Sequence, residues 1–477
     1  MPPQNERKCI MEVLGILLSL FLLMFFAYRG FSVILFAPIF ALLAAALQGF
    51  AIMPSYTELF MAKAVTYVKA FFPVFMLGAV FGKIMEDTGL AKSIAHAIIK
   101  GLGQERAILS VVLAAAVLTY GGVSLFVVVF AVYPFGAALF REANIPKRLL
   151  PGTIALGSFT FTMDCIPGTP QIQNLIPTNF FGTSIYAAPI SGMLGGILIF
   201  LGGMLWLNRR RKAAQAAGEG YGPHTINEPE VSDDAIAKLP SWQLSALPLL
   251  MVLVVNFVMN TAFTWDTNLL KPFLAMKLPL TAPAVKNVIG IWSLIIALVA
   301  GIVLAIAIGK GRLVSGGLQK SLNAGAIGSL LAIMNTASEV GYGNVIAALP
   351  GFKSIASALL GIHIGGSPLV SEAVTVNTLA GITGSASGGM SIALDLMSKD
   401  WLAWANSIGM SPEILHRVAS MASGGMDTLP HNGAVITLLA VCGLTHRQSY
   451  GDIFAMTVLK TAMVFVIIFI HSITGIL

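Results

Sequence analysis

Long apolar runs are the feature that most constrains the fold of this 477-residue chain. A helix needs about 20 apolar residues to cross the hydrocarbon core of a bilayer. Only 10% of the residues are charged, whereas a soluble domain carries about 25%. The sequence therefore predicts an all-α polytopic membrane protein, with spans expected at 10–28, 31–50, 107–140 (long enough for two segments), 185–207, 243–263, 284–309 and 453–475.

The charges and cysteines exclude several kinds of partner. The net charge is +7, but the basic residues are scattered at the ends of apolar runs, whereas nucleic-acid binding needs a clustered basic face. Cys9, Cys165 and Cys442 form no disulfide or zinc-binding pattern. We therefore expect no nucleic-acid partner, no metal and no cofactor. The first run has no small-residue cleavage site beyond it, so we expect it to be retained as a span.

Shorter apolar stretches are interrupted by Gly, Pro, Asn and Ser. Irregular backbone at membrane depth is tolerated only where it is buried in protein or lines a watery cavity. We therefore expect re-entrant hairpins and discontinuous helices at 70–101, 150–180, 320–397 and 415–445.

A hydrophilic stretch divides the chain into two hydrophobic halves. It begins with the basic cluster 209–212 and continues with Gly, Pro, Glu and Asp, a composition typical of a linker. The basic cluster indicates the cytoplasmic side. The predicted organisation is a first transmembrane repeat at 1–207, a cytoplasmic linker at 208–240 and a second repeat at 241–477.

Three short patterns recur in the same order in both halves. Met-Asp-x-x-Pro occurs at 163–167 and 426–430, and Gly-Gly-x-Ser occurs at 121–124 and 388–391. A turn at Pro146 is matched by one at Pro412. Because the offset is nearly constant, we infer an internal duplication.

The loop charges favour inverted halves. The loop 141–148 has three basic residues, whereas its longer counterpart 399–417 has only Lys399 and Arg417, balanced by two acids. The positive-inside rule places the first loop in the cytoplasm and favours the second outside. Two inverted-topology repeats with broken helices form a common plan of secondary transporters.

The two Met-Asp-x-x-Pro sites are the strongest functional candidates. Proline and glycine break the helix around each of them, which frees backbone groups and creates helix N-termini that favour an anion. An acid in an apolar segment is by default a functional candidate, although Asp164 and Asp427 could instead cap broken helix ends. His431 could carry a proton or simply line the break.

Two further pairs of breaks are expected to contribute. The Gly-Ser segments at 121–124 and 384–391 could unwind and present backbone groups, or could allow tight helix packing. The segments 82–89 and 335–344 are interpreted as hairpin tips that close over a substrate. Asp87 and Thr88 could alternatively cap the returning helix.

The chain resembles the gluconate permease (GntP) family of the ion transporter superfamily over nearly its whole length. The resemblance rests on Leu77-Gly78-x-x-Phe81-Gly82-Lys83-x-x-x-Asp87-x-Gly89, Gly121-Gly122, Pro167-Gly168-Thr169-Pro170 and Leu429-Pro430-His431-Asn432-Gly433. It implies a scaffold plus a transport domain, elevator-type alternating access, a homodimer, and import of a small hydroxy acid across the bacterial inner membrane, with protons rather than sodium.

The two breaks depart from the gluconate members, which carry Pro-Pro-His-Pro-Gly-Pro where this chain has 166–171, and His-Val-Asn-Asp where it has 427–432. The variant is similar to the 3-hydroxybutyrate permease branch, which implies a small hydroxy monocarboxylate such as 3-hydroxybutyrate or gluconate. Alternatives are a sodium-coupled dicarboxylate or citrate transporter and, from other classes, an anion channel or a membrane-embedded enzyme. No P-loop, HExxH or GxSxG motif is present, so we expect no catalytic residues.

We expect no lysine or arginine in the broken segments to pair with a carboxylate permanently, with Lys83 the nearest exception. We therefore expect helix N-termini near 168–169 and 388–389 to bind the anion. The candidate substrate-binding residues are Asp87, Thr88, Gly121, Gly122, Ser124, Gly168, Thr169, Gln171, Asn174, Asn335, Thr336, Ser385, Ser387, Gly388, Gly389, His431 and Asn432. The candidate coupling residues are Asp164, Glu339, Asp427 and His431.

Overall fold

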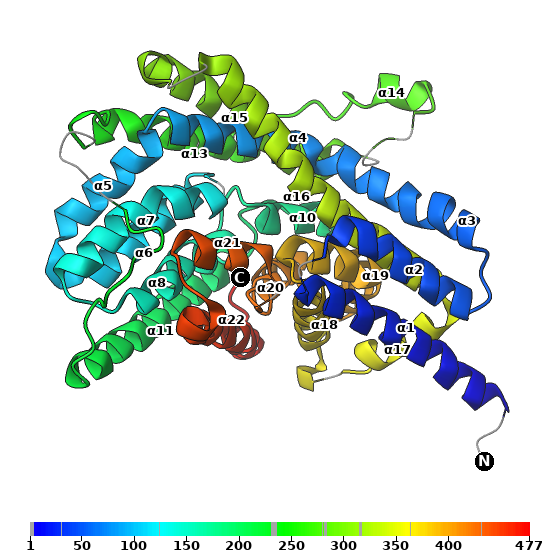
Figure 1. The fold of residues 1–477 in the computed structure, drawn as a ribbon. Coiled ribbons are helices and arrows are strands. Elements are labelled where there is room, and N and C mark those ends of the chain that lie inside the picture. Colours follow the sequence, from blue (N-terminus) through cyan, green and yellow to red (C-terminus); the bar gives the residue numbers. More distant parts are fainter. Residues whose placement is uncertain are drawn as a thin grey trace.

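The computed structural model describes residues 4–29, 31–123, 125–229, 236–278, 280, 284–313, 317–362, 364–430 and 432–477. All regular secondary structure in these ranges is helical (Figure 1). The predicted all-α class is confirmed.

The first half of the chain contains α1 (Gln4–Tyr28), α2 (Val33–Leu47), α3 (Ile52–Pro54), the π-helix η1 (Ser55–Met61), α4 (Ala62–Asp87), α5 (Leu90–Leu102), η2 (Gln104–Arg106), α6 (Ala107–Tyr120), α7 (Leu125–Glu142), η3 (Lys147–Leu149), α8 (Leu150–Ser158), α9 (Phe161–Asp164), α10 (Ile172–Phe181) and α11 (Pro189–Ala216). The second half contains α13 (Trp242–Thr261), α14 (Lys271–Ala275), η4 (Val285–Asn287), α15 (Ile289–Gly309), η5 (Lys310–Arg312), α16 (Gly317–Ala348), α17 (Pro350–Leu360), η6 (Ile364–Gly366), α18 (Leu369–Thr383), α19 (Ala386–Ser407), α20 (Pro412–Ser423), α21 (Gly433–Val441) and α22 (His446–Thr474).

Five helical stretches among the described residues are long and apolar enough to cross a bilayer. A sixth is possible if α5 and the η2–α6 helix, which are bent by 106° relative to each other, form one span. The long stretches are Ile52–Asp87, Pro189–Ala216, Trp242–Thr261, Ile289–Arg312 and His446–Thr474.

Two helical hairpins reverse direction at glycine. The 14 residues of α6 extend about 21 Å at the helical rise, which is shorter than the hydrocarbon core of about 30 Å. The chain turns back into α7 at Gly121-Gly122, where Gly122 has a φ of 92°. The hairpin of α18 and α19 turns at Gly384, where φ is 66°. Glycine adopts this left-handed conformation without strain.

The helices α4 and α16, which hold matching places in the two halves, run antiparallel. Phe60, which precedes α4 in the same helical stretch, lies against Gly341, and Val80 near the end of α4 lies against Gly325. Ser321 Oγ donates to Asp87 Oδ2 at 2.6 Å.

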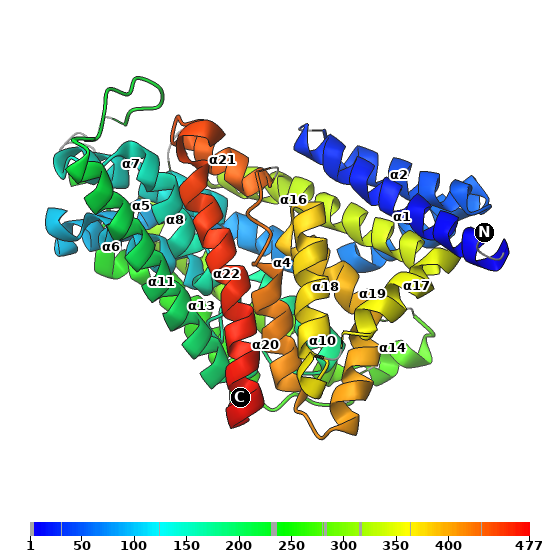
Figure 2. The same cartoon turned by 90° about the horizontal axis from the view of Figure 1, so that it is seen from below.

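The last helices of the two halves, α11 and α22, also run antiparallel (Figure 2). At the start of α11, Ile190 N donates to the Leu477 carbonyl at 2.9 Å. Farther along α11, Trp206 Nε1 donates to Asp452 Oδ1, near the start of α22, at 3.0 Å. Matching helices therefore point in opposite directions, as expected for inverted-topology repeats.

The expected hairpin tip at 335–344 is wrong, because α16 is one continuous helix of 32 residues. Its small residues instead bring neighbouring helices close, since a β-carbon on Gly341 would crowd Phe60 and one on Gly343 would crowd Ile392. In the first half, a turn does occur at Thr88-Gly89 between α4 and α5.

Part of the hydrophilic stretch packs against the basic loop at 141–148. Glu228 forms ion pairs with Lys147, at 2.6 Å, and with Arg141, and Arg148 donates to Glu219 at 2.6 Å. Partial burial opposes ionisation of Glu228, but its hydrogen bonds to Lys147 and Arg141 lower its pKa below the ordinary value. The stretch and the basic loop therefore lie on one side of the molecule.

Candidate functional site

The first break, between α8 and α10, is tied to the tip of the first hairpin. Gln171 Nε2 donates to the Thr119 carbonyl at 2.7 Å. Tyr120 Oη donates to the Pro167 carbonyl at 2.9 Å. Gly168, with a φ of 79°, allows the chain to turn between these contacts.

The second break, between α20 and α21, is tied to the second hairpin in a corresponding way. Asn432 Nδ2 donates to the Gly384 carbonyl at 2.7 Å. The Oδ1 atom of the same side chain accepts hydrogen bonds from Ala434 N and Val435 N and so caps α21. Gln171 and Asn432 both occupy the N-cap position of the helix after the break. Each break thus places an amide at the N-cap of the helix that follows it, where its side chain holds the facing hairpin tip.

The two predicted aspartates are buried where the breaks meet. Asp164 is 1% exposed and Asp427 is 6% exposed. Asp164 Oδ1 accepts a hydrogen bond from Cys165 Sγ at 2.9 Å, whereas Oδ2 has no hydrogen-bond partner among the described residues. A β-carbon on Gly424 would overlap this free oxygen. The Asp164 carboxylate therefore lies directly against the second break.

A buried lysine joins the breaks. Lys460 of α22 is 1% exposed. Its Nζ forms an ion pair with Asp427 at 2.8 Å and donates to the Phe159 carbonyl at 2.9 Å. The prediction covered only lysine and arginine within the broken segments, and the cation that pairs with Asp427 comes instead from α22, a span outside them.

A second buried cation lies in a segment that was predicted to be a loop. Arg417 lies inside α20 and is fully buried, not in a loop. Its NH2 atom donates to the Ala187 carbonyl at 2.7 Å, and its NH1 atom donates to Asn174 Oδ1 at 3.1 Å. The loop between α19 and α20 is shorter than predicted, at 408–411. It carries no basic residue, which strengthens the charge difference from loop 141–148.

Asn174 and Thr169 stabilise the first break from within. Asn174 Nδ2 donates to the carbonyls of Thr169 and Ile185 at 3.1 and 2.8 Å. Thr169 Oγ1 donates to the Thr162 carbonyl at 2.7 Å. These side chains fix the path of the broken backbone.

Glu339 faces the start of α19 at the second hairpin tip. Its Oε2 atom occupies the position that a β-carbon on Gly388 would take. Gly388 N donates to Ser385 Oγ at 3.1 Å, and Thr336 Oγ1 lies 3.4 Å from Ser387 Oγ. The predicted anion site at 388–389 thus already contains a carboxyl group of the protein.

Gly121-Gly122 serves both turning and packing, whereas Gly388-Gly389 lies within α19 and serves packing. A β-carbon on Gly121 would lie 2.8 Å from Leu249 Cδ2. One on Gly389 would overlap the backbone of Ala380 in α18. Both interpretations made from the sequence therefore apply at 121–124, while in 384–391 the helix is broken only at Gly384-Ser385 and the later glycines pack.

Other predicted residues lie elsewhere. Asp87 pairs with Lys83 at 2.8 Å and accepts from Ser321 of α16, and Thr88 Oγ1 donates to the Ile84 carbonyl at 2.6 Å, so both serve the packing at the end of α4. The proposed capping of α5 by these two residues is wrong, since the N-cap is Gly89 without a side-chain bond. Asn335 is half-buried within α16. Ser124 and His431 lie outside the described residues.

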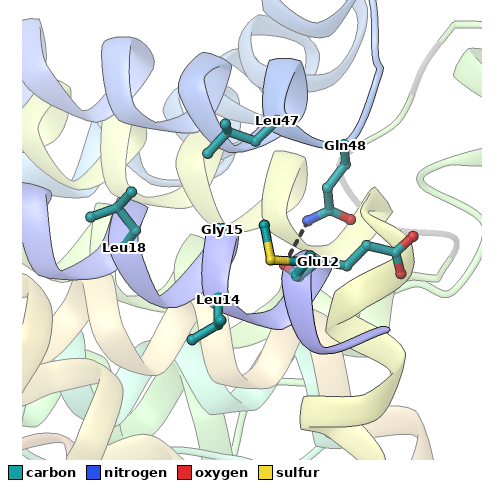
Figure 3. Close-up of a pocket in the computed structure, with 7 residues that line it drawn as sticks. Glu12, Leu14, Gly15, Leu18, Leu47 and Gln48 are labelled. Carbon is teal, nitrogen blue, oxygen red and sulfur yellow. Dashed lines mark hydrogen bonds between the residues drawn. The ribbon is translucent and has the colours of Figure 1, made fainter. Parts of the chain in front are cut away.

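A surface pocket of about 460 Å³ lies between α1 and α2, away from the breaks (Figure 3). Its polar contact is Gln48 Nε2 to the Glu12 carbonyl, at 3.1 Å. The apolar part includes Leu14, Leu18 and Leu47, which are about half exposed. Such side chains on membrane helices fit lipid better than a small anion.

Two buried cations were not predicted as such, Lys460 and Arg417. A lone lysine inside an apolar span is a functional or structural signal in its own right, so Lys460 could have been found. Its partner could not, because the spacing between Lys460 and Asp427 gives no indication of contact.

Comparison with known proteins agrees with this fold. Residues 8–473 match the GntP family permease family. The chain is 54% identical over 480 residues to the uncharacterized transporter YxjC of Bacillus subtilis, covering 98% of this chain and 100% of that protein. It is 29% identical over 224 residues to the low-affinity gluconate transporter of Escherichia coli K12, covering 43% of this chain and 46% of that one.

Two solved transporters share the fold at low sequence identity. The YdaH transporter of Alcanivorax borkumensis superposes with a TM-score of 0.54 and 13% identity, covering 92% of this chain and 96% of that one. MtrF of Neisseria gonorrhoeae gives a TM-score of 0.51 and 12% identity, covering 91% and 94%. The chain is a polytopic transporter that belongs to the GntP permease family.

Proposed function

We propose that the protein imports a small hydroxy monocarboxylate, such as 3-hydroxybutyrate or gluconate, together with protons. The observation that carries this proposal is the start of α10. Gln171 at its N-cap makes no side-chain cap hydrogen bond to the helix, whereas Asn432 caps α21. A helix start whose amides lack a side-chain cap is suited to bind one carboxylate.

The surroundings of α10 supply groups for the hydroxyl. Gln173 is buried, and its Oε1 atom has no hydrogen-bond partner among the described residues. Asp164 Oδ2, in the same break, is also without one. Buried polar groups without partners are costly, so a hydroxyl that donates to either oxygen would be favoured.

The buried cations support one carboxylate over two or three. The Lys460 ammonium is held by Asp427 and the Phe159 carbonyl. The Arg417 guanidinium is held by Ala187 and Asn174. Lys460 could neutralise a substrate carboxylate only if its buried pair with Asp427 broke, which is costly. Arg417 is held by neutral groups, so it offers charge for one carboxylate and not for two or three. This argues against the dicarboxylate and citrate alternatives.

We also propose that residues 1–207 and 241–477 act as inverted repeats around this site. The two amide-held hairpin tips would open in turn during elevator-type movement, within a homodimer in the bacterial inner membrane. The antiparallel helices, the basic loop beside the linker and the gluconate transport of a partial relative support this proposal.

Competition for uptake tests the substrate. In proteoliposomes, unlabelled 3-hydroxybutyrate should block uptake of labelled 3-hydroxybutyrate more strongly than gluconate or citrate at equal concentration. Protein-free liposomes provide the background. If citrate is the strongest competitor, the site accepts several carboxylates and the sodium-coupled alternative replaces this proposal.

A further inference from the structure

Three buried oxygen atoms near the second hairpin lack hydrogen-bond partners among the described residues. They are Glu339 Oε2 of α16, Tyr67 Oη of α4 and Ser391 Oγ of α19. Their residues are 2%, 5% and 3% exposed. The Tyr67 hydroxyl lies beside Ser391 and Thr336, whereas the Glu339 carboxyl acts on it by charge only. Each atom thus has hydrogen-bonding capacity that a bridging water molecule would use.

An ion pair continues this group toward the surface. Lys63 Nζ lies 2.6 Å from Asp395 Oδ1, and their side chains are 34% and 17% exposed. Lys63 is one helical turn before Tyr67 on α4, and Asp395 is one turn after Ser391 on α19. Residues spaced in this way share a helix face. A polar line therefore leads from the partly exposed Lys63–Asp395 pair through Tyr67 and Ser391 to Glu339.

Glu339 has no cationic partner among the described residues, unlike Asp427 with Lys460. The helix α2, which packs on α16, has no titratable side chain. Tyr56 and Glu58 of η1 are exposed. Tyr67 is thus the titratable group that faces Glu339 from α4. On α19, the first titratable residue along the helix is Asp395. A buried carboxyl group without a cation is most stable when protonated.

We propose that Glu339 carries the coupling proton and that Tyr67 and Ser391 conduct it from the Lys63–Asp395 pair. The inference rests on the proposed proton-coupled uptake and names its proton site. A water molecule bridging Tyr67 and Glu339 gives a proton to Glu339 Oε2 and takes the Tyr67 Oη proton, while Tyr67 takes another proton from a water molecule on the Ser391 side. No net charge remains on the phenol. Release of the proton from Glu339 would leave its carboxylate facing the first turn of α19, at Gly388.

The position of the line fits uptake from outside. The turn after α4 lies beside the end of the linker, since Ser93 Oγ donates to the Pro240 carbonyl at 2.6 Å. Lys63 lies near the opposite end of α4. With the linker in the cytoplasm, the Lys63–Asp395 pair is on the outward side.

Substituting the conducting residues tests the proposal. In Tyr67→Phe and Asp395→Asn, proton-driven accumulation of labelled 3-hydroxybutyrate should fall by about tenfold, because the relay is interrupted. Counterflow exchange, which needs no net proton movement, should stay close to wild type and report that the variants fold. The matched control is Tyr342→Phe, which removes a buried hydroxyl that contacts Ser19 outside the line.

A second readout needs no substrate. After transfer to D₂O, infrared spectroscopy should show a protonated carboxyl band that Glu339→Gln removes. Deuterium exchange of this band should be slower in Tyr67→Phe than in Tyr342→Phe. Equal exchange rates in Tyr67→Phe and Tyr342→Phe would overturn the proton route, and so would a carboxyl band that Glu339→Gln leaves unchanged. The route would also be overturned if sodium stabilised the wild-type protein and Glu339→Gln abolished that stabilisation. If wild type transports no hydroxy acid while the infrared result holds, the substrate proposal alone fails.

Discussion

Replacing Lys460 by methionine is expected to destabilise the folded protein by about 3–5 kcal/mol, the range seen when one partner of a buried ion pair is removed. The change leaves Asp427 without its cation and the Phe159 carbonyl without its donor. Because Phe159 and Asp427 belong to different breaks, the two halves of the site lose a direct link. Denaturant unfolding in detergent measures the loss of stability, and uptake should be abolished.

Two comparisons separate charge from packing in this prediction. Lys310→Met, at an exposed position after α15, should unfold like wild type. The double variant Asp427→Asn/Lys460→Met should recover much of the lost stability, because no unpaired charge is left buried. A single Lys460→Met variant as stable as wild type would contradict the buried pair.

Gly424→Ala is expected to reduce the initial uptake rate at least about tenfold, which corresponds to about 1.4 kcal/mol. The added methyl group would overlap Asp164 Oδ2. Since φ at Gly424 is in the ordinary range, the effect is steric and acts on the carboxylate itself. Overpacking of this kind costs about 1–3 kcal/mol in stability, so the protein should still fold.

Gly433→Ala is the matched control for this substitution. Gly433 starts α21, and a β-carbon there meets no atom within 4 Å. Uptake per reconstituted protein and the thermal midpoint should both remain near wild type. If Gly424→Ala transports as fast as Gly433→Ala, the contact between Asp164 and the second break has no role in transport.

The sequence predicted the broken segments best where the duplication repeated a distinctive motif. Asp164 and Asp427 were singled out because Met-Asp-x-x-Pro recurs, and both lie buried at breaks. Breaks at Gly121-Gly122 and near Gly384 were predicted from composition, because left-handed backbone favours glycine, but the prediction did not identify them as hairpin turns.

The errors arose where packing between distant segments decides the structure. The segment 335–344 contains Asn, Ser and Gly, yet it is helical because α4 packs along α16 and overrides weak local propensity. Lys460 meets Asp427 only because α22 passes both breaks. Tyr67 gave no signal, since a tyrosine in an apolar helix resembles an ordinary core residue.

Uptake of labelled 3-hydroxybutyrate into proteoliposomes, with proton and sodium gradients imposed separately, tests the central proposal most directly. An inward proton gradient alone should drive accumulation above equilibrium, and a protonophore should abolish it. A sodium gradient alone should give no more uptake than protein-free liposomes. Accumulation that requires sodium and persists with the protonophore would contradict proton-coupled import, and equilibration without accumulation under either gradient would indicate a channel.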